Sequence, residues 1–142
     1  MRFLLDVNVL VALAFPPHAS HQRAQSWFRL EPDPLWATCH LTQAGFLRVA
    51  SRKLGGSRDA IRKPLAGLER DCQSRSHEYW PADADLRDLS DSMRPRLIGP
   101  NQIADMQLVM VAHRHRGQLA TFDTGIRALA SGTRYANSFL VL

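Results

Sequence analysis

The chain has 142 residues, of which 45% are hydrophobic and 22% charged, and this suits one globular domain rather than a disordered, fibrous or coiled-coil protein. Eighteen Lys and Arg against thirteen Asp and Glu give a formal net charge of +5, which favours polyanionic partners such as nucleic acid. Two cysteines, Cys39 and Cys72, are too few for a disulfide framework and show no zinc-binding spacing, so we expect a reducing compartment.

The N-terminal segment starts with a basic residue and a mostly apolar run to Phe15, as a secretory signal does. Asp6 and Asn8 argue against that interpretation, because a carboxylate costs about 2.5 to 3.5 kcal/mol in the middle of an inserting apolar helix. No other segment approaches the roughly 18 apolar residues of a membrane span. We therefore expect a cytoplasmic protein with no membrane contact.

The hydrophobic pattern predicts strands that alternate with helices. In chain order we expect a strand at 2–5, helices at 7–15 and 20–30, a strand at 35–39, helices at 42–51 and from 57, a strand at 77–80, helices at 83–93 and 102–116, a strand at 119–123, a helix at 124–130 and a strand at 138–142. Such alternation predicts an α/β protein, in which helices cover both faces of a mainly parallel sheet of about five strands.

Three residues mark expected features of these helices. Ser57 is a typical N-cap residue. Pro64 lies seven residues further on and predicts either a kink or two shorter helices, because proline removes a helix hydrogen bond. Gly117 is expected to end the helix before it in a left-handed conformation.

Three aspartates lie where chemistry is expected in such a sheet. Asp6 ends the first predicted strand, Asp123 ends the fourth, and Asp105 lies among apolar neighbours at the start of the strongest predicted helix. A single aspartate after a strand is commonly a turn or cap residue. Three together predict a shared site, because ligands of parallel sheets bind at the carboxyl ends of the strands.

Clustered carboxylates raise one another's pKa values, so a site built from them is charged and stable only with a cation present. Mg²⁺ prefers oxygen ligands and binds one or two carboxylates together with substrate phosphate. In a basic protein, such a site predicts hydrolysis of a phosphodiester by metal-activated water.

Four segments carry a resemblance to a known family: residues 4–10 (LLDVNVL), 38–49 (TCHLTQAGFLRV), 104–108 (ADMQL) and 119–123 (LATFD). In this order and at this spacing they resemble the PIN domain family, and within it the VapC toxins of bacterial toxin-antitoxin systems. The resemblance covers essentially the whole chain and implies a single PIN domain over residues 1–142 with a three-layer α/β/α fold. It further implies Mg²⁺- or Mn²⁺-dependent endoribonuclease activity on RNA, homodimerisation and inhibition by a cognate VapB-type antitoxin.

Residue by residue, the resemblance assigns Asp6, Asp105 and Asp123 to three of the family's four acidic, metal-binding positions, and Asn8 and Thr121 to its polar supports. At the fourth position, Gln43 stands where the family generally has Glu. The nearest acids in the sequence, at positions 31 and 33, lie in a proline-rich segment and do not align. A Gln carbonyl can ligate a metal or orient a water, so Gln43 is included among the expected catalytic residues.

The departure at Gln43 leaves an alternative open, in which a catalytically weakened PIN domain binds RNA or an antitoxin without cleaving RNA. Two enzyme and signalling classes with an aspartate after the first strand are disfavoured. Haloacid-dehalogenase-like phosphatases need a second Asp where this chain has Asn8, and both they and response-regulator receivers need a Lys late in the chain. The only lysines are Lys53 and Lys63.

A basic run between residues 48 and 63 contains a single acid, Asp59. It predicts an RNA-binding patch near the site, with a solvated helix face as the alternative. The basic residues of this run are Arg48, Arg52, Lys53, Arg58, Arg62 and Lys63.

Two further groups of side chains are interpreted structurally. We expect the core and a dimer interface to take up the aromatic residues Trp27, Phe28, Trp36, Phe46 and Trp80. His113 and His115 lie two residues apart on a predicted helix, so they point in different directions and are expected at the surface.

Overall fold

The structure is a computed structural model that describes residues 1–31 and 34–142; Asp33, one of the two acids considered above, lies outside this part. The elements are β1 (Arg2–Leu5), α1 (Val7–Ala14), α2 (His21–Leu30), β2 (Leu35–Thr38), α3 (His40–Lys53), α4 (Arg58–Cys72), β3 (His77–Tyr79), α5 (Gln102–Arg114), β4 (Gln118–Thr121), α6 (Gly125–Ala130) and β5 (Phe139–Val141), with 3-10 turns at Leu86–Asp88 and Arg94–Arg96. Apart from residues 83–93, the helices and strands begin and end within two residues of the predicted bounds.

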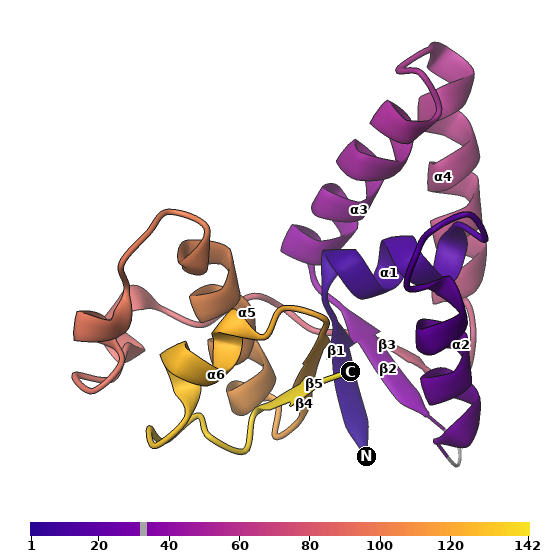
Figure 1. Cartoon of the computed structure of the whole chain (residues 1–142). Helices are drawn as coiled ribbons and strands as arrows, with labels where there is room; N and C mark the ends of the chain where they lie inside the picture. The colour runs from indigo at the N-terminus through magenta and orange to yellow at the C-terminus, as the bar shows by residue number, and fades with distance from the viewer. Residues whose placement is uncertain (32–33) are drawn as a thin grey trace.

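The strands form one parallel sheet in the order β3-β2-β1-β4-β5, with β1 in the centre (Figure 1). β1 and β4 are neighbours, and Leu5 is paired with Ala120. The residues that follow these strands therefore meet at the same edge of the sheet. The predicted α/β class and five-stranded parallel sheet are confirmed.

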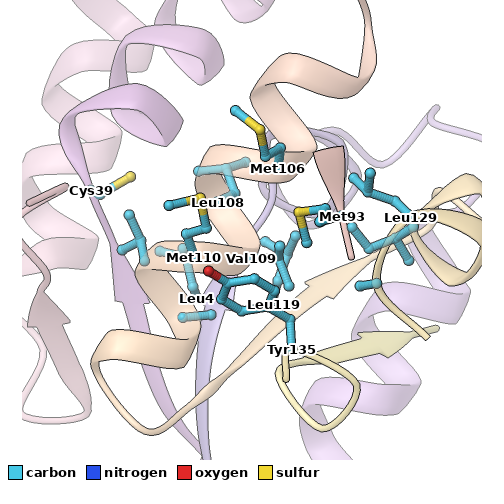
Figure 2. Packing of buried hydrophobic residues seen from close by; sticks show 14 of the residues in the cluster. Leu4, Cys39, Met93, Met106, Leu108, Val109, Met110, Leu119, Leu129 and Tyr135 are labelled. Carbon is cyan, nitrogen blue, oxygen red and sulfur yellow. The ribbon is translucent and has the colours of Figure 1, made fainter. Parts of the chain in front are cut away.

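Alternate side chains of β1 enter two separate cores, because successive residues of a strand point to opposite faces. Leu4 packs on one face with α5, α6 and the buried side chain of Met93 (Figure 2). Phe3 and Leu5 pack on the other face with α1, α3 and α4. The sheet is thus the middle layer of a three-layer α/β/α arrangement.

Helices α3 and α4 form a hairpin that projects beyond the sheet (Figure 1). Gly55 and Gly56, both with positive φ, lie at its turn, where only glycine adopts the left-handed backbone without strain. Ser57 then caps α4 by accepting a hydrogen bond from the Ala60 amide at 3.2 Å. Of the two alternatives predicted at Pro64, two shorter helices is wrong, since α4 continues through this buried residue and its packing against α3 offsets the lost hydrogen bond. The kink stays a prediction.

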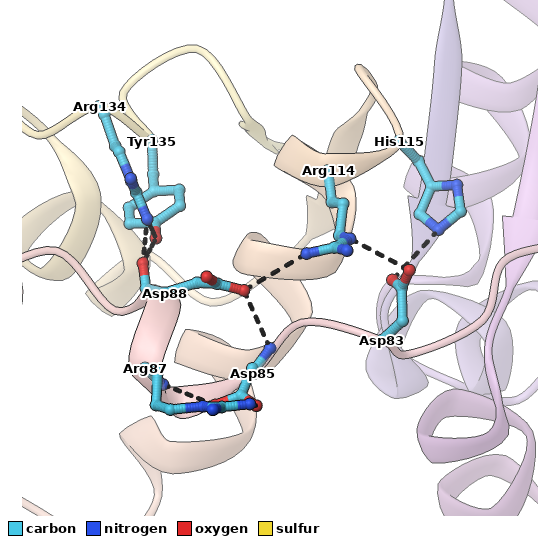
Figure 3. Close-up of polar contacts among 8 residues, drawn as sticks. All are labelled: Asp83, Asp85, Arg87, Asp88, Arg114, His115, Arg134 and Tyr135. Atoms are coloured by element: carbon cyan, nitrogen blue, oxygen red, sulfur yellow. Dashed lines mark hydrogen bonds and ion pairs between the residues drawn. The ribbon is translucent and has the colours of Figure 1, made fainter.

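The predicted helix at 83–93 was also wrong, since this segment contains only a 3-10 turn. The Asp85 carboxylate accepts a hydrogen bond from the Arg87 amide and pairs with its guanidinium, and Arg114 of α5 reaches Asp88 (Figure 3). Aspartate competes with the helix in this way by bonding nearby backbone groups. These polar contacts hold the segment over α5, in place of the backbone hydrogen bonds that a helix would form.

The end of α5 differs from prediction in one respect. The left-handed residue is Arg116, with φ 55°, rather than Gly117. Gly117 serves close packing instead, because a Cβ there would lie 2.3 Å from the Trp80 ring and 2.9 Å from the Arg2 carbonyl oxygen.

The remaining structural expectations concern burial. Trp36, Phe46 and Trp80 are buried, as expected for core residues, whereas Trp27 and Phe28 are only partly buried. His113 is exposed, and His115 is partly covered where it stacks on Trp80 with the ring centroids 4.9 Å apart. Both cysteines are free thiols. None of the helices in the described part of the chain is long and apolar enough to cross a membrane.

Candidate active site at the edge of the sheet

Asp6 is the residue at which β1 becomes α1, and it acts as the N-cap of that helix. One carboxylate oxygen, Oδ1, accepts a hydrogen bond from the Val7 amide at 2.6 Å. The other, Oδ2, accepts one from the Thr121 hydroxyl at 2.6 Å. The side chain is only 7% exposed, and two short charge-assisted bonds fix its orientation.

Thr121 connects the β1 and β4 ends of the site. Besides donating to Asp6, its Oγ1 accepts hydrogen bonds from Asn8 Nδ2 at 3.1 Å and from the Asp123 amide at 3.0 Å. Asn8 Oδ1 in turn accepts a hydrogen bond from the Phe122 amide at 3.3 Å. The two predicted supports, Asn8 and Thr121, therefore lie beside the aspartates whose loops they hold.

Asp105 faces the same region from the first turn of α5. With Asp6 and Asp123 it lines a cleft of about 380 Å³, which also receives side chains from the α1–α2 loop and from α3. The structure thus gathers the three predicted aspartates, from three separate parts of the sequence, around one cleft.

The three carboxylates also influence one another electrostatically. Burial, followed by the charges of Asp6 and Asp123, raises the pKa of Asp105 to about 6. Burial raises the pKa of Asp6 too, and the charge of Asp123 adds to this, while the hydrogen bonds from Thr121 and the Val7 amide oppose it. A cation in the cleft would relieve this repulsion.

The aspartates line the cleft but do not form a compact cluster. Within residues 1–31 and 34–142, no three His, Cys, Asp or Glu side chains lie close enough together to form a metal-binding group. The tight convergence expected from the sequence is therefore not seen. The donors are nevertheless all oxygen atoms, and the cleft has room for a divalent cation that keeps several waters and uses one or two carboxylates. The site fits such a cation in its hydrated form.

Gln43 does not line this cleft. Its Nε2 donates a hydrogen bond to Thr38 Oγ1 at 2.9 Å, on the side of α3 that faces β2 and α4. Thr38 Oγ1 lies 2.8 Å from His77 Nε2, and His77 Nδ1 lies 3.1 Å from the Cys72 carbonyl oxygen. Gln43 was predicted among the site residues, whereas in the structure it belongs to this separate polar network.

The α3 residue that faces the start of α1 is Gly45. A Cβ at this position would lie 2.5 Å from Val7 Cγ2, so there is no room for a side chain beside Val7, the residue that follows Asp6. One and two turns further along, α3 contributes Val49 and Lys53 to the cleft. This helix therefore contributes the ammonium group of Lys53 to the site and no carboxylate.

The predicted basic run surrounds the hairpin turn between α3 and α4, and all six of its side chains are exposed. Lys53 alone among them reaches the cleft. Lys63 lies on the rim of a separate apolar groove between α1, α2, α3 and α4.

His18 is a cleft residue that the sequence analysis missed. It lies in the loop after α1, directly after a proline pair, and no motif marks it. Only the course of this loop places it at the cleft that the aspartates line.

Comparison with known proteins identifies the family of the chain. The sequence model of the PIN domain family matches residues 3–132. The chain therefore belongs to the PIN domain family, as its motifs indicated.

Relatives place the chain within one branch of that family. It is 38% identical over 130 residues to ribonuclease VapC44 of Mycobacterium tuberculosis, covering 92% of each chain. It is 35% identical over 134 residues to ribonuclease VapC39 of the same organism, covering 92% of this chain and 95% of that protein. The chain is thus of the VapC type. A similar fold occurs in the crystal structure of M. tuberculosis VapC20, a toxin that cleaves the sarcin-ricin loop, with a TM-score of 0.62, 15% identity, and coverage of 94% of this chain and 97% of that one.

Proposed function

We propose that this chain is the toxin ribonuclease of a toxin-antitoxin pair, an endoribonuclease that depends on Mg²⁺ or Mn²⁺. The observation that carries the proposal is the set of three electrostatically coupled aspartates around one cleft, Asp6, Asp105 and Asp123, in a chain whose relatives bear the name ribonuclease.

In this proposal each polar residue has a defined task. Asp6, Asp105 and Asp123 hold the divalent cation, which when bound supplies positive charge to the phosphate and to the attacking water. Thr121 and Asn8 keep Asp6 and the Asp123 loop in place through the hydrogen bonds described above. Because water attacks phosphorus as the ester bond breaks, the products carry a phosphate and a free hydroxyl at the cleaved position.

RNA is proposed to reach the cleft along the α3–α4 hairpin. Its exposed basic side chains lie on both sides of the turn, and Lys53 joins this surface to the cleft. Contacts of this kind are with phosphates and carry no sequence information, so they account for binding of RNA as a class.

A binding module without activity is the second candidate, and one observation favours it. α3 brings no carboxylate to the cleft, so three acidic groups must suffice where the family generally has four. The two candidates differ in whether the wild-type protein cleaves RNA at all.

The decisive experiment is single-turnover cleavage of total cellular RNA with Mg²⁺ or Mn²⁺ and with EDTA. Asp6→Asn, Asp105→Asn and Asp123→Asn each remove one charge at nearly constant size, and we expect each to lower the rate at least 100-fold. Asp91→Asn, at a fully exposed acid outside the cleft, is the matched control and should cleave like the wild type. Wild-type rates equal to those of Asp6→Asn in Mn²⁺ would favour the binding module.

The proposed partners are a second copy of the chain and a VapB-type antitoxin. The apolar groove of about 650 Å³ between α1, α2, α3 and α4 offers a surface for an antitoxin segment. Light scattering should give twice the chain mass of 16.0 kDa, and the product of a neighbouring small gene should co-purify and suppress cleavage. A monomer that co-purifies with nothing from its native host would remove this part of the proposal.

A further inference from the structure

The residues that line the cleft are of two chemical kinds. The aspartates enter from the ends of β1 and β4 and from α5, whereas His18 enters from the α1–α2 loop and Lys53 from the end of α3. None of the ion pairs in the described part of the chain involves Lys53. Its charge is therefore available to an anion in the cleft.

The ring of His18 is held in one hydrogen-bonding state. Its Nδ1 accepts a hydrogen bond from the Ser20 amide at 3.1 Å, and its own amide donates to the Phe15 carbonyl oxygen at 2.9 Å. A neutral imidazole that accepts at Nδ1 carries its proton on Nε2. Among the described residues, no acceptor is paired with this Nε2–H group, so it is a donor available to a molecule in the cleft.

A phosphodiester needs such groups at this site. Its negative charge is repelled by three carboxylates, and its two non-bridging oxygens accept hydrogen bonds. One cationic donor and one neutral donor on the wall of the cleft would offset the repulsion and orient the phosphate, and donors fixed in advance stabilise charge most effectively. The aspartates supply none of these donors.

We propose that His18 and Lys53 form a phosphate-binding pair, in which His18 Nε2–H and the Lys53 ammonium group donate to the non-bridging oxygens of the RNA phosphate in the cleft. The inference rests on the proposed function and deepens it, since it adds His18 as a residue that touches substrate. His18 keeps its proton in this role, so no proton transfer is assigned to it. In this PIN domain, the contribution of α3 to the site is then the positively charged side chain of Lys53.

The first test measures binding without cleavage, using a fluorescent 12-nucleotide RNA at low salt in EDTA. We expect His18→Ala and Lys53→Met each to weaken binding about 10-fold, because each loses one hydrogen bond to a charged group. His18→Gln should keep most of the affinity, since its amide places an N–H donor close to the position of Nε2. Two controls should bind like the wild type: His40→Ala, an exposed histidine of α3, and Arg29→Ala, an exposed arginine of α2.

A second measurement needs no variant to fold. Two-dimensional NMR of the wild type with ¹⁵N-labelled histidine should show His18 as the Nε2–H tautomer, and the Nε2–H resonance should shift when the RNA is added. Unchanged affinity in His18→Ala, or an Nε2–H resonance that does not respond to RNA, would overturn the inference.

Cleavage assays with Mg²⁺ separate this inference from the proposed function. If the wild type binds RNA through His18 and Lys53 but cleaves no faster than Asp6→Asn, the nuclease proposal fails and the phosphate pair stands. If the wild type cleaves and His18→Ala cleaves and binds equally well, the phosphate pair fails and the nuclease proposal stands.

Discussion

Gln43→Glu is the substitution for which the sequence and the structure predict opposite results. On the family pattern it would add a fourth carboxylate to the site and tighten metal binding. In the structure, it replaces the amide that donates to Thr38 Oγ1 with an acceptor. Thr38 is fully buried and has one hydroxyl proton, which goes to His77 Nε2, because His77 Nδ1–H donates to the Cys72 carbonyl oxygen. The new carboxylate therefore loses its partner at Thr38 and has only the weak thiol donor of Cys72, whose Sγ lies 4.0 Å from the side-chain nitrogen that Gln43 has there.

The size of the effect follows from this network. A buried polar group left without its partner costs about 1 to 3 kcal/mol, and because Gln43 is itself only partly buried we expect a loss near 1 to 2 kcal/mol. For a chain of this size, that lowers Tm by roughly 4 °C per kcal/mol.

The loss should depend on pH through His77. Burial lowers the pKa of His77 in the wild type, so its stabilising neutral state is present above the unfolded value near 6.5 and is lost as the pH falls. A carboxylate beside Thr38 raises the pKa of His77, so the protonated ring becomes acceptable in the fold. The variant should therefore be most destabilised at pH 8 and less so at pH 6.

Thermal unfolding at pH 6 and pH 8, with and without Mn²⁺, measures the loss of stability, its pH dependence and the effect of the metal. Gln73→Glu, which adds the same charge at an exposed position just after α4, is the matched control. We expect the Mn²⁺-induced rise in Tm to be the same in wild type, Gln43→Glu and Gln73→Glu. A larger Mn²⁺-induced rise in Tm in Gln43→Glu alone would mean that residue 43 reaches the cleft. Its assignment to the polar network with Thr38 would then be wrong.

Three further predictions follow from single contacts. Asp105→Asn should be more stable than the wild type at pH 7.5 and nearly equal to it at pH 4, since a carboxyl with a pKa raised to about 6 penalises the fold only when ionised; unfolding at both pH values measures this. Gly45→Ala should destabilise by about 1 to 3 kcal/mol through overpacking, and Val7→Ala should recover most of the loss if the 2.5 Å approach is its cause. Reversing the charges of Arg58 and Arg62 should reduce the slope of the logarithm of the RNA-binding constant against the logarithm of the salt concentration, by roughly 0.7 per lost phosphate contact. An unchanged slope would make this surface a solvated helix face.

Much of the site could be predicted from the sequence because it is built at strand ends. Apolar runs fix β1 and β4, their parallel pairing aligns Leu5 with Ala120, and the next residues, Asp6 and Thr121, are then forced together. The position of Asp105 follows similarly from the strong apolar pattern of α5. These inferences need only the local pattern and the rules of parallel sheets.

The predictions that disagree with the structure concern residues whose position depends on three-dimensional packing rather than on the local sequence pattern. Two residues on a helix differ by about 200° in direction, so Gln43 and Gly45 face opposite sides of α3, and only its packing on α1 shows which side meets Asp6. Residues 83–93 contain helix-like apolar spacing, yet the local bonds of Asp85 and the ion pairs to Arg114 favour an irregular path. His18 depends on the course of a loop, for which periodicity gives no information.

The charge of the cleft leads to a last prediction, on the number of cations. With Asp6, Asp105 and Asp123 ionised and Lys53 protonated, the lining carries a formal charge of −2. One divalent cation neutralises it, whereas a second would leave +2 before substrate arrives and would have to bind beside the Lys53 ammonium group. Isothermal titration of Mn²⁺ should therefore give one ion per chain at neutral pH, with Lys53→Met tightening its binding because a like charge is removed. Two ions of comparable affinity in the wild type would refute this accounting and would require a ligand outside the three aspartates.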